Sequence, residues 1–427
     1  MKLTHGLLFV TVLFAWSLVL FYIATNEVKM FTPTMQTVMF DEQYCLGYNF
    51  LRSQKSFRED GLEPVTLTTH GTSGIIEEIE KKSSSWDGPI SFALFIDYHS
   101  KLALEYIADV HRCNTKFQEK VSVHIAFRIS PYQMFCQPIQ YPKPLRSCED
   151  FIRNQKKYQR EIDAPFQLYP FNIMRNLARK GAQSEIHLVM DADMITSDGF
   201  ATKVKKISNK MINGRNKNAL VIRRFETNEK FIPRDNVKLK AGFDNKTIFE
   251  FHHKFFFVGH RIPDIQKWFN VSGKSNKVSS WEIPYLGAQW ETPVIIHRND
   301  VYNADYFPAR IRDVQSLIYK LCRANYTFNL LSHVFSVHEG VKIEDTMYSK
   351  VVSEHSRKYG RNKAFTRYVK EMDDLYPHTI KRVQKSKAMI TERIPFDNFI
   401  RFHNQRKSEG EYDNDRESKE IHDVLRS

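Results

Sequence analysis

The sequence predicts an α/β protein with a mixed, mostly parallel sheet flanked by helices, behind an N-terminal transmembrane helix. Two observations predict the sheet: apolar runs alternate with helical patterns between residues 65 and 127, and a further apolar run at 186–190 ends in acid. Strands that alternate with helices favour parallel pairing. The third observation is that residues 6–24 carry no charge, and a run of this length nearly spans a bilayer.

The predicted strands are buried apolar runs, and the predicted helices repeat apolar residues every three or four positions. In chain order they are a strand at 65–69, a helix from Ser73 through Ile79, a strand at 89–96, a helix at 102–110, a strand at 121–127, a helix at 172–179 and a strand at 186–190. Ser73 is placed to cap its helix. Gly181 stands where the C-cap of the helix at 172–179 would fall.

Composition indicates a well-packed globular protein, because 42% of the 427 residues are hydrophobic and 13% are aromatic. The formal net charge is +14, which suits nucleic acid, anionic membrane or acidic small molecules. The basic residues are scattered, and we interpret small clusters such as Lys205-Lys206 and Arg223-Arg224 as solvated surface. No nucleic-acid-binding module is recognisable, so no nucleic-acid partner is predicted.

The N-terminal run predicts how the chain is organised. It is long and ends in bulky residues, whereas a cleaved signal peptide, the competing interpretation, has a shorter apolar core and small residues at its end. Lys2 on the short side predicts that this side is cytoplasmic. The predicted parts are a cytoplasmic tail at 1–5, a transmembrane signal anchor at 6–24, a stem at 25–60, a lumenal domain at 61–400 and a charged, disordered tail at 401–427.

Two further features are typical of a lumenal protein. Glycosylation sequons begin at Asn245, Asn270 and Asn325. The five cysteines could in part pair in an oxidising compartment. Cys136 and Cys148 flank a Pro-rich loop and are our first choice for a disulfide, whereas Cys322 lies on the apolar stripe of a helix and is interpreted as a core residue.

The chemistry of the chain can be predicted at Asp191-Ala192-Asp193, directly after the apolar run. Side chains two apart in a strand point the same way, so both carboxylates would converge at the carboxyl edge of the sheet, where such sheets bind ligands. Two oxygen donors suit Mg²⁺ or Mn²⁺, and such an ion can hold a diphosphate. The copy at Asp413-Asn414-Asp415 has no strand before it and is interpreted as solvated acid.

Several stretches together resemble one family, the LARGE-type glycosyltransferases that include the β-1,4-glucuronyltransferase of O-mannosyl glycan assembly. The resemblance covers roughly residues 44–345, and its order and spacing are far more specific than the acid pair alone. The stretches that carry it are 65–70, 86–91, 169–179, 187–197, 281–284, 321–328 and 334–340.

The resemblance implies a GT-A fold, a single-pass type II Golgi membrane protein, and a UDP-sugar donor held through Mn²⁺ (or Mg²⁺). By similarity, Asp191 and Asp193 would form the metal and ribose end of the donor site, and His338 would be the third metal ligand. Neutral imidazole is a good ligand for a first-row ion. Thr68, His70 and Arg175 are candidates for contacting the nucleotide; the ordinary alternative is strand packing for the first two and a surface helix position for Arg175.

Inverting transfer also needs a general base that takes the proton of the acceptor hydroxyl. Asp313 is the first candidate because it starts the helix that precedes His338, and Asp305 and Glu282 are the alternatives. Each could instead be a surface acid or a helix cap. The region 303–314 departs from the family pattern, so the donor site is kept while the choice of acceptor is open.

The leading hypothesis is therefore a lumenal enzyme that moves glucuronic acid or a related sugar from a UDP-sugar to a glycan or glycoprotein acceptor. The alternative is an inactive glycan-binding or scaffolding Golgi membrane protein. A haloacid-dehalogenase-like phosphatase is disfavoured because Ile195 replaces its usual Thr or Val, and a calcium loop because Thr196 replaces its Gly. The sequence leaves homo- or hetero-oligomerisation open.

Overall fold

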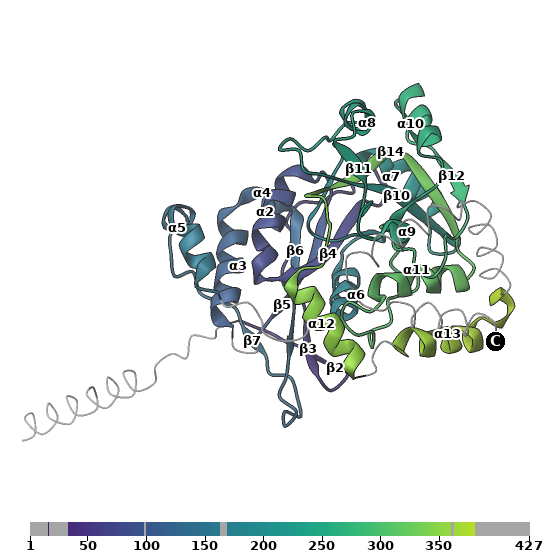
Figure 1. Cartoon of the computed structure of the whole chain (residues 1–427). Coiled ribbons are helices and arrows are strands. Elements are labelled where there is room, and N and C mark those ends of the chain that lie inside the picture. Colours follow the sequence, from purple (N-terminus) through teal and green to yellow (C-terminus); the bar gives the residue numbers. More distant parts are fainter. Residues whose placement is uncertain (1–15, 17–32, 98–99, 163–168, 360–362, 381–427) are drawn as a thin grey trace, which may run out of the picture.

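The computed structural model describes residue 16 and residues 33–97, 100–162, 169–359 and 363–380 (Figure 1). The predicted anchor at 6–24, apart from Trp16, and the predicted tail at 401–427 lie outside the described residues. Within the described ranges, no helix is both long enough and apolar enough to cross a bilayer.

The core of the protein is one large mixed sheet. Its longest ladders are parallel, namely β10 with β14, β5 with β6 and β4 with β5, which confirms the predicted mostly parallel α/β class. β11 (Ile248–Glu250) pairs with β10, and β9 (Met194–Thr196) pairs with β14. From one edge to the other, the main strands are β12 (Ser280–Ile283), β14 (Thr327–Glu339), β10 (Asn218–Thr227), β13 (Val294–His297), β8 (Ile186–Val189), β4 (Val65–Thr72), β5 (Ile90–Ile96), β6 (Val121–Arg128), β3 (Tyr44–Leu51) and β2 (Val38–Phe40).

Helices cover both faces of this sheet. The helical segments are η1 (Ser73–Ile75), α2 (Ile76–Ser85), α3 (Lys101–Cys113), α4 (Thr115–Lys120), α5 (Cys148–Arg160), α6 (Phe171–Gly181), α7 (Phe200–Met211), α8 (Asn236–Asp244), α9 (Phe257–His260), α10 (Ile265–Lys274), α11 (Asp313–Arg323), α12 (Met347–Lys358), α13 (Ala364–Leu375) and η3 (Pro377–Thr379). The strands and helices predicted between residues 65 and 190 are confirmed as β4, α2, β5, α3, β6, α6 and β8. The predicted cap at Ser73 is wrong, because Ser73 is the first residue of η1 and α2 begins at Ile76.

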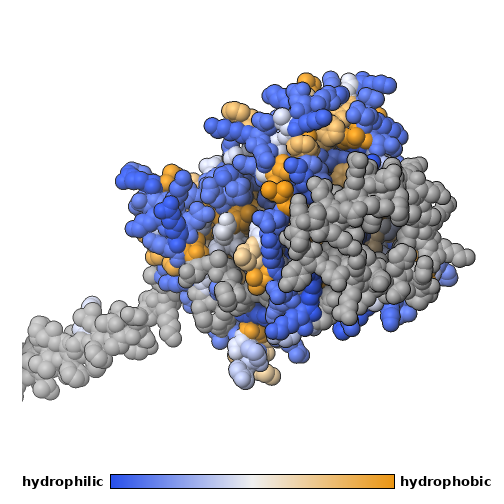
Figure 2. Space-filling model, viewed as in Figure 1, coloured by the Kyte–Doolittle hydropathy of each residue, from blue (hydrophilic) through white to orange (hydrophobic). Residues whose placement is uncertain are grey.

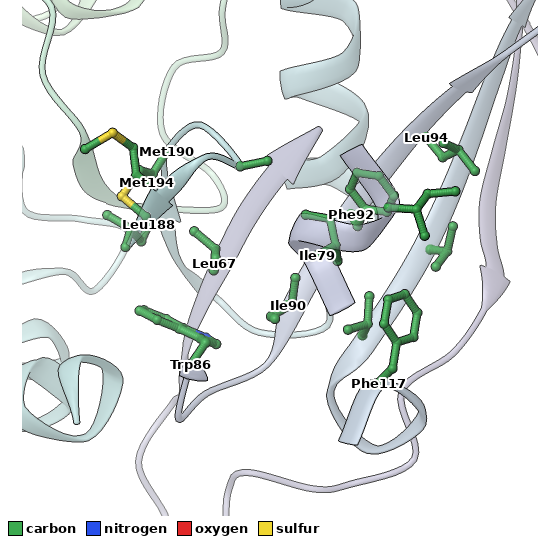
Figure 3. Packing of buried hydrophobic residues seen from close by; sticks show 14 of the residues in the cluster. Leu67, Ile79, Trp86, Ile90, Phe92, Leu94, Phe117, Leu188, Met190 and Met194 are labelled. Atoms are coloured by element: carbon green, nitrogen blue, oxygen red, sulfur yellow. The ribbon is translucent and has the colours of Figure 1, made fainter. Parts of the chain in front are cut away.

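Strand β5 shows how the sheet separates two cores. Its side chains alternate between the two faces, as they must in a pleated strand. Phe92 and Leu94 pack with α2 and α4, as Figure 3 shows for Ile79 and Phe117. Phe95, on the other face, packs against α6. Because both faces are covered, every residue of β5 is buried, which explains its continuous apolar sequence.

The predicted stem at 25–60 is wrong for the part that the structure describes. β3 lies in this range and pairs antiparallel with β6, with β2 paired outside it, so these residues belong to the main sheet. The ladder of β3 shifts register between Gly47 and Leu51, and Asn49 adopts a positive φ of 56°. This bulge breaks the alternation of apolar residues that would have marked a strand.

The predicted disulfide between Cys136 and Cys148 is also wrong. Cys45 on β3 pairs with Cys136, and Cys113 at the end of α3 pairs with Cys148 at the start of α5. Sequence proximity misled the prediction because packing of α3 against α5, not the short loop, brings the second pair together. Cys322 is buried on α11 and belongs to neither disulfide, as expected of a core residue.

Gly181 is required for close packing and not for a left-handed C-cap. It is the last residue of α6, and Ala182 takes the C-cap position with extended backbone. A Cβ on Gly181 would lie 2.3 Å from Cε1 of His124. The imidazole cannot retreat easily, because Asn49 N donates to its Nδ1 at 2.8 Å and its Nε2 contacts Ser91 Oγ at 2.9 Å.

We therefore expect Gly181→Ala to lower the free energy of unfolding by about 1–3 kcal/mol, the usual cost of overpacking a core. Gly273→Ala is the matched control, because Gly273 also lies near the end of a helix and a Cβ there meets nothing within 4 Å. Denaturant unfolding of both variants tests this. Equal stabilities of the two would show that the contact with His124 relaxes without cost.

Candidate functional site

The acid pair lies in the turn that links β8 to β9. β8 ends at Val189, and Ala192 and Asp193 already belong to the turn, so the extended geometry predicted for both carboxylates does not persist. The pair still lies at the carboxyl end of β8, next to the carboxyl end of β4, because the two strands are parallel. The two acids nevertheless contact different partners.

Asp193 faces His338 because β9 and β14 are antiparallel. Their register places Met194, the residue after Asp193, opposite His338. The Nε2 of His338 lies 3.5 Å from Oδ2 of Asp193, while its Nδ1 lies 2.9 Å from the carbonyl oxygen of Gly340. This carbonyl can only accept, so Nδ1 carries the proton in the neutral ring and the lone pair of Nε2 points toward Asp193. The structure therefore brings together two of the three predicted metal ligands.

Asp191 lies between two arginines. Its carboxylate oxygens lie 3.6 Å from Arg175 on α6 and 3.8 Å from Arg224 on β10, and both arginine side chains are only 7% exposed. Desolvation by the surrounding protein would raise the pKa of Asp191, but the guanidinium of Arg175, followed by that of Arg224, outweighs it and lowers the pKa. Asp191 is thus held as a carboxylate at the edge of the sheet.

The prediction that Arg223 and Arg224 belong to the solvated surface is wrong. The two side chains leave opposite faces of β10 and both are buried. Arg223 pairs with Glu250 at 2.9 Å, whereas Arg224 stacks 4.0 Å above the ring of Phe251 and donates to Nδ1 of His260 at 2.7 Å. Two arginines inside the apolar run of β10 were the available signal, since a central strand cannot solvate them.

Thr68 and His70 line the same pocket, together with Arg175, Asp191 and Arg224. Thr68 donates its hydroxyl to the carbonyl of Leu188 at 3.1 Å, so strand packing already satisfies it. Nδ1 of His70 contacts the hydroxyl of Tyr169 at 2.8 Å, whereas its buried Nε2 contacts no hydrogen-bond partner in the described part of the chain. Burial lowers the pKa of His70 to about 3, so it is a neutral imidazole with an unused nitrogen.

Of the candidate general bases, Asp313 alone lies beside the acid pair. It is the first residue of α11, and its Oδ2 accepts from Nη1 of Arg175 at 2.8 Å. Arg175 therefore links Asp313 to Asp191 through one guanidinium group. Because both carboxylates contact the same cation, Asp313 lies within the reach of a ligand that occupies this pocket.

Asp305 and Glu282 are placed differently. Asp305 accepts a hydrogen bond from Asn176, and burial raises its pKa. Its charged neighbours include Lys180, which lies five residues after Arg175 on α6, an axial distance of about 7.5 Å. Glu282 lies exposed on the edge strand β12, opposite Asn329. His338 lies nine residues after Asn329 on β14, which corresponds to a distance on the order of 30 Å along the strand. The structure does not bring Glu282 to the acid pair.

A second cluster of possible metal ligands adjoins Arg224 and was not foreseen. One ligand atom from each of His252, His260 and Glu291 lies within 4.8 Å of the others. The three predicted ligands Asp191, Asp193 and His338 do not form so tight a group. Local sequence gives no signal for the cluster, because its three members come from α9, the segment before it and the loop before β13.

Hydrogen bonding favours a supporting role for this cluster over metal binding. Arg224 donates to Nδ1 of His260, so the ring proton is on Nε2, which faces Glu291 at 2.9 Å and Nδ1 of His252 at 2.9 Å. A metal ion on Nε2 would require His260 either to become an imidazolate or to carry its proton on Nδ1, facing the N–H group of Arg224, and both are unfavourable. We therefore assign Glu291 and the two histidines to holding Arg224 against Asp191.

Most of the chain is similar to proteins of one known family. The profile of the family described as "Glycosyl-transferase for dystroglycan" matches residues 64–377. The β-1,4-glucuronyltransferase 1 of Danio rerio is 24% identical over 342 residues, which cover 74% of this chain and 76% of that protein. The human β-1,4-glucuronyltransferase 1 is 24% identical over 338 residues, covering 74% of this chain and 77% of that protein.

More distant similarities cover less of the other protein. The xylosyl- and glucuronyltransferase LARGE2s of Danio rerio is 22% identical over 292 residues, which are 68% of this chain but 33% of that protein. A solved structure of GalNAc-T7 with UDP, GalNAc and Mn²⁺ superposes with a TM-score of 0.39 at 9% identity, over 71% of this chain and 51% of that one. S. aureus TarS with UDP-GlcNAc gives a TM-score of 0.33 at 12% identity, over 65% of this chain and 60% of that one.

Proposed function

Because this chain belongs to the glycosyl-transferase family whose profile spans residues 64–377, we propose that it is an active transferase of the GT-A type. In this proposal it moves glucuronic acid or a related sugar from a UDP-sugar to a glycan or glycoprotein acceptor, with inversion at the anomeric carbon. The donor is held through Mn²⁺ or Mg²⁺. The names of the glucuronyltransferases among its relatives support the choice of sugar.

The main support for this proposal is that Asp193 and His338 lie in contact, beside Asp191, at one edge of the sheet. A carboxylate oxygen and the lone pair of an imidazole suit Mn²⁺, and the hydrogen bond from Nδ1 to the Gly340 carbonyl is the kind of support that metal-ligating histidines have. Asp193 and His338 would hold the ion. When bound, the ion would neutralise charge on the departing diphosphate.

The other residues would bind and orient the donor. The unused Nε2 of His70 can exchange a hydrogen bond with the nucleotide, since it lies in the pocket and has a lone pair or a proton to offer. Asp191 is kept ionised by Arg175 and Arg224, so it can accept hydrogen bonds from hydroxyl groups of the donor. The same two arginines supply positive charge where the anionic donor must lie.

Asp313 would take the proton from the acceptor hydroxyl. We expect Asp313→Asn to lower kcat about 100-fold, the lower part of the range for general-base catalysis, while binding of UDP changes little. Steady-state kinetics and UDP binding of the same preparation test this. Glu282→Gln is the matched control and should keep wild-type kcat, because Glu282 lies on the far edge strand. An unchanged kcat for Asp313→Asn would exclude Asp313 as the base and direct the search to Asp305.

The decisive experiment is a screen of UDP-sugars for Mn²⁺-dependent hydrolysis or transfer by the purified protein. The proposal expects turnover that chelation removes and that metal restores. Hydrolysis of phosphomonoesters would contradict the assignment. Binding of UDP without any turnover would favour the second candidate, an inactive glycan-binding or scaffolding protein, for which the divergent segment at 303–314 is the supporting feature.

We also propose that the protein is a type II Golgi membrane protein with its enzyme domain in the lumen. The uncharged run at 6–24 supports the anchor. Two disulfides suit an oxidising compartment. The asparagines of all three sequons, Asn245, Asn270 and Asn325, are exposed. Protease protection in sealed microsomes, together with a mobility shift on removal of N-glycans, tests the topology; digestion of the domain in intact microsomes would contradict it.

A further inference from the structure

An uncharged loop projects from the protein between β6 and the short strand β7 (Ile139–Gln140). Residues 129–142 contain no acidic or basic side chain, although 26% of the whole chain is charged. Near the tip of the loop, Tyr132 is 93% exposed, Met134 83% and Phe135 64%. In Figure 1 this loop extends beyond the lower edge of the molecule, and Figure 2 shows apolar and weakly polar atoms on the projecting segment. Exposed large apolar side chains that gather in one place usually mark a binding surface.

The loop is held in this position by its own contacts and by a covalent bond. The disulfide between Cys136 and Cys45 ties its base to β3. Within the loop, Gln133 N donates to the carbonyl of Ser130 at 3.0 Å, and Gln133 Nε2 donates to the carbonyl of Phe135 at 2.8 Å. An apolar tip that is already ordered loses little conformational entropy when it is covered.

The loop also adjoins the point where the chain enters the domain. β1 (Thr34–Met35) pairs with β7, Tyr141 N donates to the carbonyl of Pro33 at 3.1 Å, and Thr37 Oγ1 donates to the carbonyl of Gln137 at 3.0 Å. Only residues 25–32 separate Pro33 from the uncharged run at 6–24. A chain of this length spans at most about 30 Å even when fully extended. The base of the loop is therefore tethered close to the predicted anchor.

The chemistry of the loop fits the lipid–water interface. Tyrosine and phenylalanine are favoured at that boundary, where an aromatic body meets lipid and a polar group stays in water. The first charged residue after the loop is the exposed Lys143, a cation that suits lipid headgroups. The next acidic residue is Glu149, so the loop itself carries no charge that would have to be desolvated at the interface.

We propose that Tyr132, Met134 and Phe135 insert into the interface of the bilayer that the N-terminal anchor crosses, as a second contact that orients the domain on the membrane. This proposal goes beyond the transferase activity and rests on the anchor at 6–24. A covalent anchor alone leaves a domain free to rotate about its linker. A second contact near Pro33 would restrict that rotation and present one side of the sheet to the lumen.

The test uses the full-length protein in liposomes that contain acyl-chain-brominated lipid, a quencher of tryptophan. Trp16 lies inside the predicted anchor, and the chain has four other tryptophans, so the difference in quenching between the wild type and Trp16→Phe reports whether the anchor is inserted. The Trp16→Phe background keeps Trp86, Trp268, Trp281 and Trp290, so the fluorescence that Tyr132→Trp adds to that of the background protein reports the loop. Phe231→Trp is the matched control, because Phe231 is 86% exposed between β10 and α8, which lies at the opposite end of the molecule in Figure 1.

We expect the fluorescence that Tyr132→Trp adds to fall by on the order of half, because an interfacial side chain reaches about 5–10 Å into the headgroup and acyl boundary. The fluorescence that Phe231→Trp adds should be unaffected by the brominated lipid and quenched by aqueous acrylamide. Quenching of Tyr132→Trp by acrylamide alone would overturn the proposal, because the loop then stays in water. Shielding from both quenchers would overturn it in favour of a protein partner or a second copy of the chain. Failure of Trp16 to be quenched would overturn the anchor and the loop contact together, and would leave the transferase proposal untouched.

Discussion

Asp193→Asn should abolish metal-dependent turnover, with kcat/KM reduced at least about 100-fold. Loss of a residue that merely supports a metal ligand usually costs 10–100-fold, so loss of a ligand should cost more. Among the described residues Asp193 makes no ion pair other than its contact with Nε2 of His338 at 3.5 Å, and its side chain is 53% exposed. The measurement is the Mn²⁺ dependence of UDP-sugar turnover for both proteins.

The second Asp-x-Asp sequence of the chain provides the matched control. Asp415→Asn makes the same chemical change in the same local sequence pattern but has no apolar strand before it. It should keep wild-type turnover and metal affinity. Equal losses in both variants, or turnover of Asp193→Asn close to that of the wild type, would refute the assignment of Asp193 to the metal.

Arg175→Met should lower the free energy of unfolding by about 3 kcal/mol, since removal of one partner from a buried ion pair leaves the other charge uncompensated. Asp313 accepts from Arg175 at 2.8 Å and its side chain is only 14% exposed, so it loses its main counterion. Asp191 is 42% exposed and keeps Arg224, so it contributes less to the loss. Denaturant unfolding monitored by two probes gives the free energy.

A second substitution separates the charge effect from the loss of packing. In Arg175→Met/Asp313→Asn the stranded charge is removed, so a substantial part of the lost stability should return. Thermodynamic coupling between the two sites in this double-mutant cycle is the quantity to measure. Additive effects of the two substitutions would show that Arg175 stabilises the fold through packing alone.

Much of the central sheet could be predicted from the sequence. β4, β5, β6 and β8 are buried on both faces, and such strands appear in a sequence as continuous apolar runs. β3 could not be predicted in this way, because its bulge at Asn49 interrupts the pattern. The disulfides could not be predicted either, because four cysteines allow three pairings and the packing of distant elements selects one of them.

The residues of the candidate site could likewise be predicted only in part. The sequence located the acid pair, His338 and Asp313, but it assigned Arg224 to the surface and gave no role to His260 or Glu291. Whether an arginine on a strand is solvated or buried depends on what covers that face of the sheet. Here Phe251 and the segment around His260 cover Arg224, and both are more than twenty residues away in sequence.

The sequence by itself determined where most strands and helices between residues 65 and 190 lie, and that acid follows the buried run at 186–190, because these features depend on local periodicity. Only the tertiary structure decided that the two acids separate, with Asp191 held by Arg175 and Arg224 and Asp193 opposite His338. These partners come from α6, β10 and β14, which the order of strands in the sheet brings together. Coulomb and hydrogen-bond energies depend on distance in space and on local burial, and neither quantity is determined by separation along the chain.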